Sequence, residues 1–269
     1  MKLTTFCNGT LLLVLLTACS GLLPAPTETS TPIPLTETPT TTIVWFPATN
    51  TPSPFPTQMR LPTPEQRPGL GKLLFSDAFD QPGLWNTSTS DRASASVERN
   101  RLLLSISGTG PLSIISLRSQ PVLTDFYAEA SVKLSLCGSA DQYGMIFRAA
   151  SSDSDYRFTV RCDGQERLER LISGSNMPLN NWLPSGDAPL AAPAEVKIGV
   201  WAAGSEMRFF LNDTLQFSLR DPLLRAGTLG FFAYASGADP ITVAFSDLSV
   251  YSVSYVLPTL TPLPPPPTP

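Results

Sequence analysis

The sequence predicts an all-β fold, an antiparallel β-sandwich, for residues 69–256. Apolar and polar residues alternate along most of this region, which is the period of a half-buried strand. Dipeptides of Gly, Asn and Asp separate many of the alternating stretches, and these residues suit tight hairpins because they tolerate positive φ. No stretch of the region shows a convincing helical period, so two packed sheets joined by hairpins are the expected architecture.

The clearest strand covers residues 126–136. One face carries only apolar residues: Phe126, Ala128, Ala130, Val132, Leu134 and Leu136. Further strand candidates are 73–79, 94–98, 102–107, 112–118, 143–149, 156–162, 166–173, 195–201, 207–211, 215–219, 227–235 and 242–253. The expected hairpin turns are Arg99-Asn100, Asp163-Gly164, Ala203-Gly204 and Asn212-Asp213. An immunoglobulin-like sandwich needs only about seven to nine strands, and the Cys…Trp…Cys spacing of its true members is missing.

Residues 1–18 have the features of a signal peptide. Lys2 is the only positive charge, and the apolar segment 11–16 is too short to span about 30 Å of hydrocarbon. The run Leu16-Thr17-Ala18-Cys19 resembles the lipobox of bacterial lipoproteins. That resemblance implies a diacylglycerol group on the Cys19 thiol and cleavage before it, hence an exported protein anchored by lipid to a bacterial membrane or cell surface. The alternative is an ordinary secretory signal with a coincidental cysteine.

Residues 19–68 are expected to form a disordered linker, and residues 257–269 a disordered tail. Residues 20–68 contain 12 Pro and 12 Thr, and the tail contains 7 Pro and 3 Thr. So much proline can neither continue a helix nor pair as a central strand, which favours an extended polyproline-II stalk. At about 3.1 Å per residue, the stalk would reach on the order of 150 Å. The tail is expected to fray, with a proline-rich ligand for a partner as the alternative.

Composition excludes several functional classes. The net charge is −4, which argues against a nucleic-acid partner because phosphates require clustered Lys and Arg. The chain has no histidine, which excludes within it Ser-His-Asp triads, Cys-His dyads and His-ligated metals. Any catalysis would have to use Asp, Glu, Tyr, Lys or Arg.

The four cysteines separate by position. Cys7 lies in the segment to be removed, and Cys19 is the lipidation site. Cys137 and Cys162 remain in the predicted domain, and two cysteines in an exported domain favour a disulfide. Two separate thiols are the alternative, and two thiolates without further ligands make a poor zinc site.

Several motifs carry a family resemblance. These are the start Phe75-Ser76-Asp77-Ala78-Phe79-Asp80 with Trp85, then Tyr143–Arg148, Tyr156-Arg157-Phe158, Cys162-Asp163-Gly164, Leu211-Asn212-Asp213, 227–231 and 243–250. Together they resemble the concanavalin A-like (lectin/glucanase) jelly-roll domains of bacterial surface proteins. The resemblance implies a jelly-roll β-sandwich. The family includes lectins, carbohydrate-binding modules, glycosidases and a group similar to 3-keto-disaccharide hydrolases, so it leaves the function open.

Sugar binding needs aromatic faces with polar groups nearby. The candidate ligand-binding residues are Trp182, Arg148, Arg161, Trp201, Tyr156 and Tyr143. Trp182 lies in a loop outside any strand pattern, and Arg148 and Arg161 fall on the faces of their strands opposite to the apolar residues. Tyr143 shares a face with Met145 and Phe147, and Tyr156 shares one with Phe158 and Val160, so both tyrosines are equally core candidates.

Catalytic and metal sites are less well supported. Glycosidases need two carboxyls about 5–10 Å apart. The Glu-x-Asp-x-x-Glu cluster of the retaining glucanases of this fold is missing. Residues 166–169 (Glu-Arg-Leu-Glu) place their two acids on opposite faces, which favours solvated surface charge. Related sandwiches often hold calcium with carboxylates from the first and last strands, so Asp77, Asp80 and Asp247 are candidate calcium ligands, or else turn and edge aspartates.

The sequence therefore predicts an exported surface protein whose jelly-roll domain binds carbohydrate or another extracytoplasmic ligand without catalysis. It needs no cofactor, apart from a possible structural calcium. A carbohydrate-active hydrolase and a structural or assembly domain at the cell surface are the alternatives. The expected partners are the membrane, through the N-terminal lipid, and a glycan or surface polymer.

Overall fold

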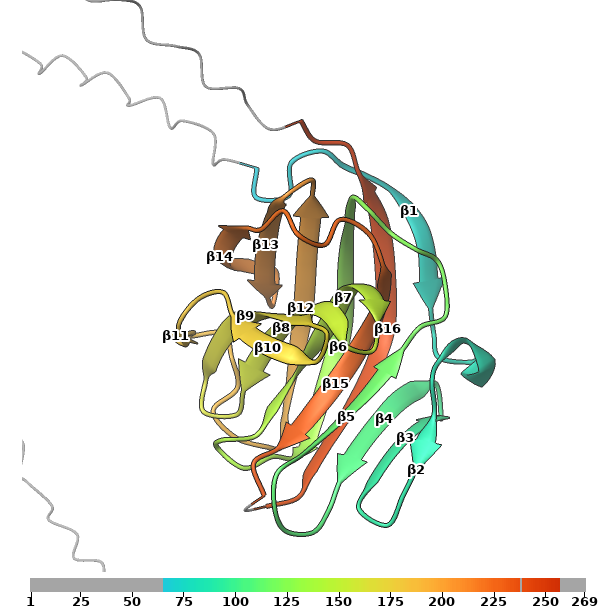
Figure 1. Cartoon of the computed structure of the whole chain (residues 1–269), viewed down its shortest axis with the longest axis vertical. Helices are drawn as coiled ribbons and strands as arrows, with labels where there is room; N and C mark the ends of the chain where they lie inside the picture. The colour runs from blue at the N-terminus through green and yellow to red at the C-terminus, as the bar shows by residue number, and fades with distance from the viewer. Residues whose placement is uncertain (1–64, 238, 257–269) are drawn as a thin grey trace, which may run out of the picture. The chain divides into compact units, whose positions relative to one another are not determined.

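Two antiparallel sheets pack face to face in a β-sandwich (Figure 1). The structure, a computed structural model, describes residues 65–237 and 239–256. The larger sheet has nine strands in the order β14-β13-β12-β6-β16-β4-β3-β2, with β1 beside β16. The smaller has seven strands in the order β10-β9-β8-β7-β15-β5, with β11 beside β9. The predicted all-β jelly-roll class is confirmed.

The strands are numbered in chain order and have the following bounds. The nine-stranded sheet contains β1 (Leu70–Asp77), β2 (Ser88–Thr89), β3 (Ala93–Glu98), β4 (Arg101–Ile106), β6 (Phe126–Leu136), β12 (Ala194–Ala203), β13 (Glu206–Leu211), β14 (Thr214–Arg220) and β16 (Ile241–Val253). The seven-stranded sheet contains β5 (Leu112–Leu117), β7 (Gln142–Ser151), β8 (Ser154–Arg161), β9 (Gln165–Ile172), β10 (Ser175–Pro178), β11 (Leu183–Pro184) and β15 (Thr228–Ala235). A short 3-10 helix, η1 (Pro82–Leu84), follows β1.

Every predicted strand corresponds to an observed one, and the predicted turns have the expected backbone. Arg99 and Asn100 both have positive φ, as do Asn212 and Asp213. The sequence missed β2, β10 and β11, because segments of two to four residues are too short to show a period. The first strand begins earlier than predicted, at Leu70, and ends at Asp77.

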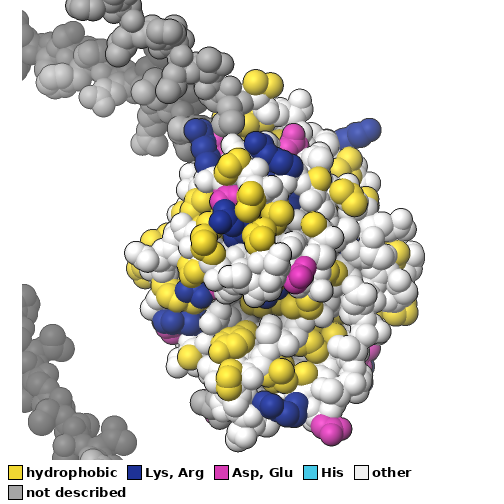
Figure 2. Space-filling model, viewed as in Figure 1, with side chains coloured by type: hydrophobic (Ala, Val, Ile, Leu, Met, Phe, Trp, Pro, Cys, Tyr) yellow, Lys and Arg dark blue, Asp and Glu magenta, His cyan; other side chains and the backbone are white. Residues whose placement is uncertain are grey.

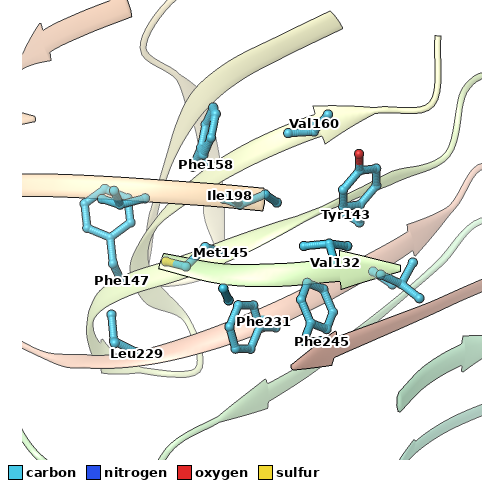
Figure 3. Packing of buried hydrophobic residues seen from close by; sticks show 14 of the residues in the cluster. Val132, Tyr143, Met145, Phe147, Phe158, Val160, Ile198, Leu229, Phe231 and Phe245 are labelled. Atoms are coloured by element: carbon cyan, nitrogen blue, oxygen red, sulfur yellow. The ribbon is translucent and has the colours of Figure 1, made fainter. Parts of the chain in front are cut away.

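The core lies between the sheets and consists of the inward-facing residues of the alternating strands (Figure 3). Phe231 of β15 stacks on Phe245 of β16 with ring centroids 4.2 Å apart. Phe158 of β8 packs on Phe209 of β13 at 4.9 Å. These pairs join the two sheets, and such aromatic pairs contribute about 0.5–1.5 kcal/mol each beyond the area that they bury.

A second apolar cluster lies on the outer face of the nine-stranded sheet and includes Tyr127, Trp201 and Phe210. The segment before β1 contacts it. The Arg67 guanidinium lies 4.7 Å from the centre of the Tyr127 ring and 4.4 Å from that of Phe210. The Trp201 Nε1 atom donates a hydrogen bond to the Pro68 carbonyl oxygen at 3.1 Å. Contacts of the domain therefore begin before the predicted boundary at residue 69.

The predicted signal peptide, Cys19, most of the linker and the proline-rich tail lie outside the described residues. Within residues 65–237 and 239–256, no helix has the length and apolar character needed to cross a membrane.

Candidate functional site: the outer face of the seven-stranded sheet

Strand pairing aligns three rows of residues on the face of the seven-stranded sheet that points away from the core. Each row crosses β15, β7, β8 and β9 in that order. The rows are Tyr234–Gln142–Arg161–Gln165, Phe232–Gly144–Thr159–Arg167 and Gly230–Ile146–Arg157–Glu169. Apart from Gln142, the face is therefore largely apolar over β15 and β7, and it is polar and charged over β8 and β9.

The apolar half is covered closely by its own side chains. Ile146, Ala149 and Phe232 form a buried cluster on this face, with Ile115 and Leu117 of β5 packed against it. The Phe232 ring lies over the sheet at Gly144, where an added Cβ would stand 2.9 Å from ring atom Cε1 and 1.9 Å from a backbone oxygen. Glycine is needed there because any side chain would displace both the ring and the neighbouring strand.

The charged half is built from arginines paired with acids two residues away on the same strand or in the following turn. Residues two apart on a strand share a face, so the spacing itself brings the charges together. Arg157 binds Asp155 with both of its hydrogen bonds, at 2.8 and 3.1 Å. The Arg161 Nε atom donates to Asp163 at 2.8 Å, and the Arg167 Nε atom donates to Glu169 at 2.5 Å.

Trp182 lies on two of these arginines. It is half-buried and stands in the loop between β10 and β11, as predicted. The guanidinium carbon of Arg167 is 4.0 Å from the indole centroid and that of Arg161 is 4.8 Å from it. Both arginines project from the same sheet face, so they support the indole from the sheet side. The loop is held in place by Asn180, whose Oδ1 atom accepts a hydrogen bond from the Leu168 backbone N–H at 2.8 Å.

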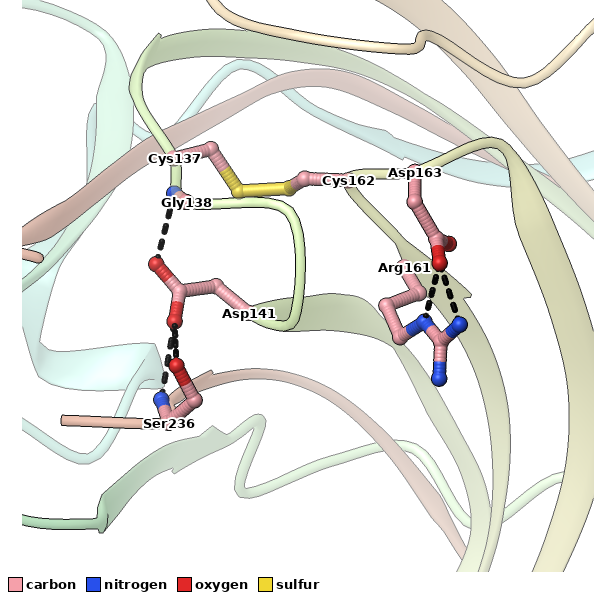
Figure 4. The surroundings of a disulfide bond; sticks show 7 residues. All are labelled: Cys137, Gly138, Asp141, Arg161, Cys162, Asp163 and Ser236. Atoms are coloured by element: carbon pink, nitrogen blue, oxygen red, sulfur yellow. Dashed lines mark hydrogen bonds and ion pairs between the residues drawn. A yellow bond between two sulfur atoms is a disulfide. The ribbon is translucent and has the colours of Figure 1, made fainter. Parts of the chain in front are cut away.

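The predicted disulfide joins Cys137 to Cys162 beside this site (Figure 4). Their Cα atoms are 6.2 Å apart, and the bridge connects the end of β6 with the end of β8. Arg161 and Asp163 flank Cys162 directly. Asp141 anchors the neighbouring turn by accepting hydrogen bonds from the backbone N–H groups of Gly138 and Ser236, both at 2.8 Å. The bridge therefore fixes the backbone that carries Arg161 and Asp163.

The pKa values of this face follow from the pairing and from burial. The hydrogen bond from Arg161 lowers the pKa of the Asp163 carboxyl and raises that of the Arg161 guanidinium. Burial raises the pKa of Asp155, although the hydrogen bonds from Arg157 oppose the effect. Asp163 is thus held in its ionised form, fixed as an acceptor beside a fixed donor.

Arg148 does not belong to the site, and its predicted exposure is wrong. Its side chain is fully buried. The pairing of β7 with β8 is irregular after Phe147, and Arg148 has a positive φ of 49°, so the alternation on which the prediction relied ends there. The guanidinium donates to the carbonyl oxygens of Thr124, Gly204 and Leu224 at 2.9, 2.8 and 3.2 Å, which ties three loops together. Burial lowers its pKa.

Trp201, Tyr143 and Tyr156 are also buried rather than available to a ligand. Trp201 lies on the outer face of the other sheet, where the segment containing Pro68 covers it. The two tyrosines face the core, as their strand parity allowed. The Tyr156 hydroxyl donates to Asp221, whereas the Tyr143 hydroxyl has no hydrogen-bond partner within the described residues. Of the six candidates, Trp182 and Arg161 are the pair that meets on the outer face of the seven-stranded sheet.

The predicted calcium ligands do not form a site. Within the described residues, no three His, Cys, Asp or Glu side chains are grouped as metal ligands would be. Asp77 is buried and binds protein groups instead, accepting from Arg118 at 2.8 Å and from the Trp85 indole at 3.1 Å. Asp80 and Asp247 are exposed.

The two acids of residues 166–169 do point to opposite faces, but neither is solvated, so that part of the prediction is wrong. Glu169 points outward and is buried under Arg167 and Asn176. Glu166 points inward, on the same side as the core residue Leu168. Its Oε2 atom has no hydrogen-bond partner within the described residues. Burial first, and the Asp187 charge second, raise its pKa to about 8.

A hollow lies on the outer face of the nine-stranded sheet. Its volume is about 380 Å³. Most of the lining residues are polar (Arg101, Ser131, Lys133, Glu195, Lys197, Asn212, Ser246 and Asp247), and Val132, Val196 and Ala244 are the apolar members. Two of the lining lysines form ion pairs, Lys133 with Glu195 at 2.9 Å and Lys197 with Asp213 at 3.2 Å. No aromatic side chain lines it, so it offers no stacking surface.

Sequence reasoning missed Thr159, Arg167, Asp163 and Glu169 as members of the Trp182 surface. Thr159 has the same strand parity as Arg161, and Arg167 that of Gln165, so parity would have placed them outward. Strand parity could not show which outward-facing residues of β8 and β9 contact Trp182. That depends on the register between the two strands and on where the loop that carries Trp182 crosses them. On the side shown in Figure 2, Lys and Arg lie separately among apolar and acidic side chains rather than in one basic stripe.

Comparisons with known proteins identify the fold of this chain but not its family or function. No family model matches the sequence, and no curated protein matches it. A Bacillus subtilis protein of unknown function with a galectin-like fold superposes with a TM-score of 0.50 and 13% identity, over 68% of this chain and 97% of that chain. A native glycosidic hydrolase gives a TM-score of 0.50 and 10% identity, over 68% and 96%. The carbohydrate-binding module CBM66 of Bacillus subtilis gives 0.49 and 15%, over 63% and 96%.

Proposed function

We propose that this domain binds a carbohydrate on the outer face of the seven-stranded sheet, without catalysis, in a protein exported and anchored by lipid at Cys19. One observation carries the binding proposal: the half-buried indole of Trp182, supported by Arg161 and Arg167. The sandwich fold alone admits binding modules and hydrolases alike, so the choice of function depends on this surface.

The surface combines the two features that sugars need. A supported indole presents a rigid apolar face to the C–H groups of a pyranose ring. Around it, guanidinium N–H groups donate and carboxylate oxygens accept, which matches hydroxyl groups that do both. The partners are fixed by their ion pairs, so little side-chain freedom is lost on binding.

Binding of glycans to Trp182 variants tests the proposal. Affinity of the full chain for a panel of polysaccharides would be measured by isothermal titration calorimetry. Trp182→Ala should weaken binding at least about tenfold, which corresponds to about 1.4 kcal/mol, and Trp182→Phe should retain most of it. The control is Val122→Ala, at an exposed residue of the loop between β5 and β6, and this variant should keep the affinity of the parent chain. Equal affinities of Trp182→Ala and the parent chain would reject this surface as the site.

Export and lipidation are supported by the lipobox-like run before Cys19 and by the disulfide, since disulfides persist in oxidising compartments. Mass spectrometry of the N-terminal peptide from membranes tests this. A diacylglycerol-modified Cys19 as first residue is expected, and Cys19→Ala should remain unprocessed and unmodified. An unmodified Cys19 in the membrane fraction would contradict the anchor.

A hydrolase is the second candidate, and one pair of acids favours it. Asp155 is paired with Leu171, and Glu169 with Arg157, so the two carboxyls are diagonal neighbours on one face. Diagonal neighbours lie about 7–8 Å apart, with their Cβ atoms somewhat closer together. Inverting glycosidases hold their carboxyls about 6.5–9.5 Å apart. Both acids form ion pairs with arginines, which favours a glycan-binding domain over a hydrolase. Release of reducing sugar by the parent chain, abolished in Asp155→Asn, would establish the hydrolase instead.

A further inference from the structure

We propose that Glu166 is a pH switch for the Trp182 surface. While its carboxyl is neutral, the segment 182–190 stays packed on the sheet, and ionisation of the carboxyl favours an open form of this segment in which the surface is lost. The switch regulates the site of the proposed function and therefore rests on it, but opening of the segment can be measured without a ligand.

The segment is attached to the strand that carries Glu166 (Figure 1). β11 follows Trp182 directly, and its Leu183 pairs with Glu166 of β9. The next attachment is the Ser185 N–H, which donates to the Gly164 carbonyl oxygen at 2.9 Å. Trp182 is therefore held in place by backbone pairing at Glu166 itself and two residues before it.

Apart from the contacts of the Trp182 indole, few interactions hold the segment. Ala188 is its only buried residue and belongs to the core cluster. Gln216 of β14 accepts a hydrogen bond from the Ser185 hydroxyl at 2.7 Å and donates one to the Asp187 carboxylate at 2.9 Å. Asn212 donates to the Asp187 carbonyl oxygen at 3.3 Å. Segments with so few buried contacts open locally at a lower free energy than the whole domain unfolds.

Glu166 lies inside the sandwich, close to this segment. Its side chain is 2% exposed, and its Oε2 atom has no hydrogen-bond partner within the described residues. At Gly164, Leu190 of the segment packs so closely that an added Cβ would stand 2.5 Å from its Cδ2 atom. An ionised carboxylate in this place lacks both water and a donor, so the closed segment favours the neutral form. Opening of the segment returns water to the carboxylate and so favours ionisation.

The charges around Glu166 act in the same direction. Asp187, on the segment, repels the ionised carboxylate. Tyr143, on β7, stays neutral because burial raises the pKa of its hydroxyl far above the ordinary value. Arg170, on the same strand as Glu166, is paired with Asp221. In the opposite sheet, β13 and β14 contribute apolar side chains to the core: Met207, Phe209, Leu211, Phe217 and Leu219.

The direction of the switch follows from two pKa values of Glu166. In the closed segment, burial and the Asp187 charge raise its pKa from 4.5 to about 8. In the open form, with the carboxyl in water, the pKa returns to about 4.5. Between these values the closed form keeps a proton that the open form releases, so opening increases by up to about tenfold per pH unit. The segment therefore closes in acid and opens as the pH rises towards about 8.

Hydrogen–deuterium exchange followed by mass spectrometry tests the switch on the full chain with its disulfide oxidised. After correction for intrinsic exchange rates, the opening equilibrium of the segment should rise at least about tenfold between pH 5 and pH 8. In Glu166→Gln it should stay constant. Glu98→Gln, at an exposed residue at the end of β3, is the matched control and should follow the parent chain. The core strand β6 should exchange more slowly than the segment at each pH, because the opening is local.

Two results would overturn the switch. One is an equal pH dependence in Glu166→Gln and the parent chain, and the other is a segment that exchanges only together with β6. If Glu166→Gln does not fold, Asp187→Asn replaces it. Its opening should level off at a lower pH than in the parent chain, because loss of the Asp187 charge lowers the pKa of Glu166, and an unchanged pH would overturn the switch.

A titration with laminarin, dextran and levan links the opening to the site. For any of the three that binds, the affinity of the parent chain should fall at least about threefold from pH 5 to pH 8, and that of Glu166→Gln should stay constant. A constant affinity in the parent chain would overturn the regulation and leave the proposed function. Absence of binding, with the segment opening as expected, would contradict the proposed function and not the pH-dependent opening.

Discussion

Glu166 should make the stability of the domain fall as the pH rises from about 4.5 to about 8. Its side chain is 2% exposed, and one of its oxygens has no hydrogen-bond partner within the described residues. Burial raises its pKa from 4.5 to about 8. Between these values the folded chain keeps a proton that the unfolded chain releases, so each pH unit costs stability. Above about pH 8 both states are ionised and the loss is complete.

The magnitude follows from the two pKa values. The difference between about 8 and 4.5, multiplied by 1.36 kcal/mol per pH unit, gives a loss of about 5 kcal/mol. That is a large share of the 5–15 kcal/mol by which a domain is usually stable. Glu166→Gln removes the titration, because an amide keeps the size and stays neutral. Between pH 4.5 and 8.5, the free energy of unfolding of the variant should therefore rise relative to that of the parent chain by up to about 5 kcal/mol.

Urea denaturation of the oxidised chain, followed by tryptophan fluorescence, measures the free energy of unfolding at each pH. The control is Glu98→Gln, an exposed residue at the end of β3, whose curve should run parallel to that of the parent. A constant difference between Glu166→Gln and the parent across pH 4.5–8.5 would refute the reasoning, since it would mean that Glu166 ionises at the same pH in both states.

Three further predictions concern stability. Tyr143→Phe should stabilise the domain by about 1–3 kcal/mol in the same urea assay, because it removes a buried hydroxyl without a hydrogen-bond partner; destabilisation would show that the hydroxyl is bound. Cys137→Ser with Cys162→Ser should lower the free energy of unfolding by about 3–4 kcal/mol, and no change would mean that the bridge does not form. Arg148→Lys should cost about 3 kcal/mol or more, since one ammonium cannot reach three loop carbonyls, and a loss below 1 kcal/mol would contradict that role.

Strand positions could be predicted because they depend on neighbours along the chain. The alternation from Phe126 to Leu136 needs no tertiary information, and it forms β6 with the expected faces. The Asn212-Asp213 turn follows from residues that tolerate positive φ. The pairing of Cys137 with Cys162 was favoured because no other cysteines remained in the domain.

The candidate site could be predicted only in part. Trp182 and Arg161 were expected at the surface, and the structure places them together. Arg148 was misplaced because an irregularity at Phe147 and a positive φ reverse the parity of the strand end. Trp201 was misplaced because the segment that covers it, at Pro68, lies 133 residues away in sequence.

The sequence by itself determined the longer strands, the turns, the two-sheet class and the disulfide, because each of these follows from residue types at short spacing or from composition. Only the tertiary structure decided which side chains meet: Trp182 with Arg161 and Arg167, Asp163 beside the bridge, and Glu166 in the core. Those contacts depend on the register between strands and on where loops cross the sheets, and a shift of one residue would have turned every side chain of a strand to the opposite face.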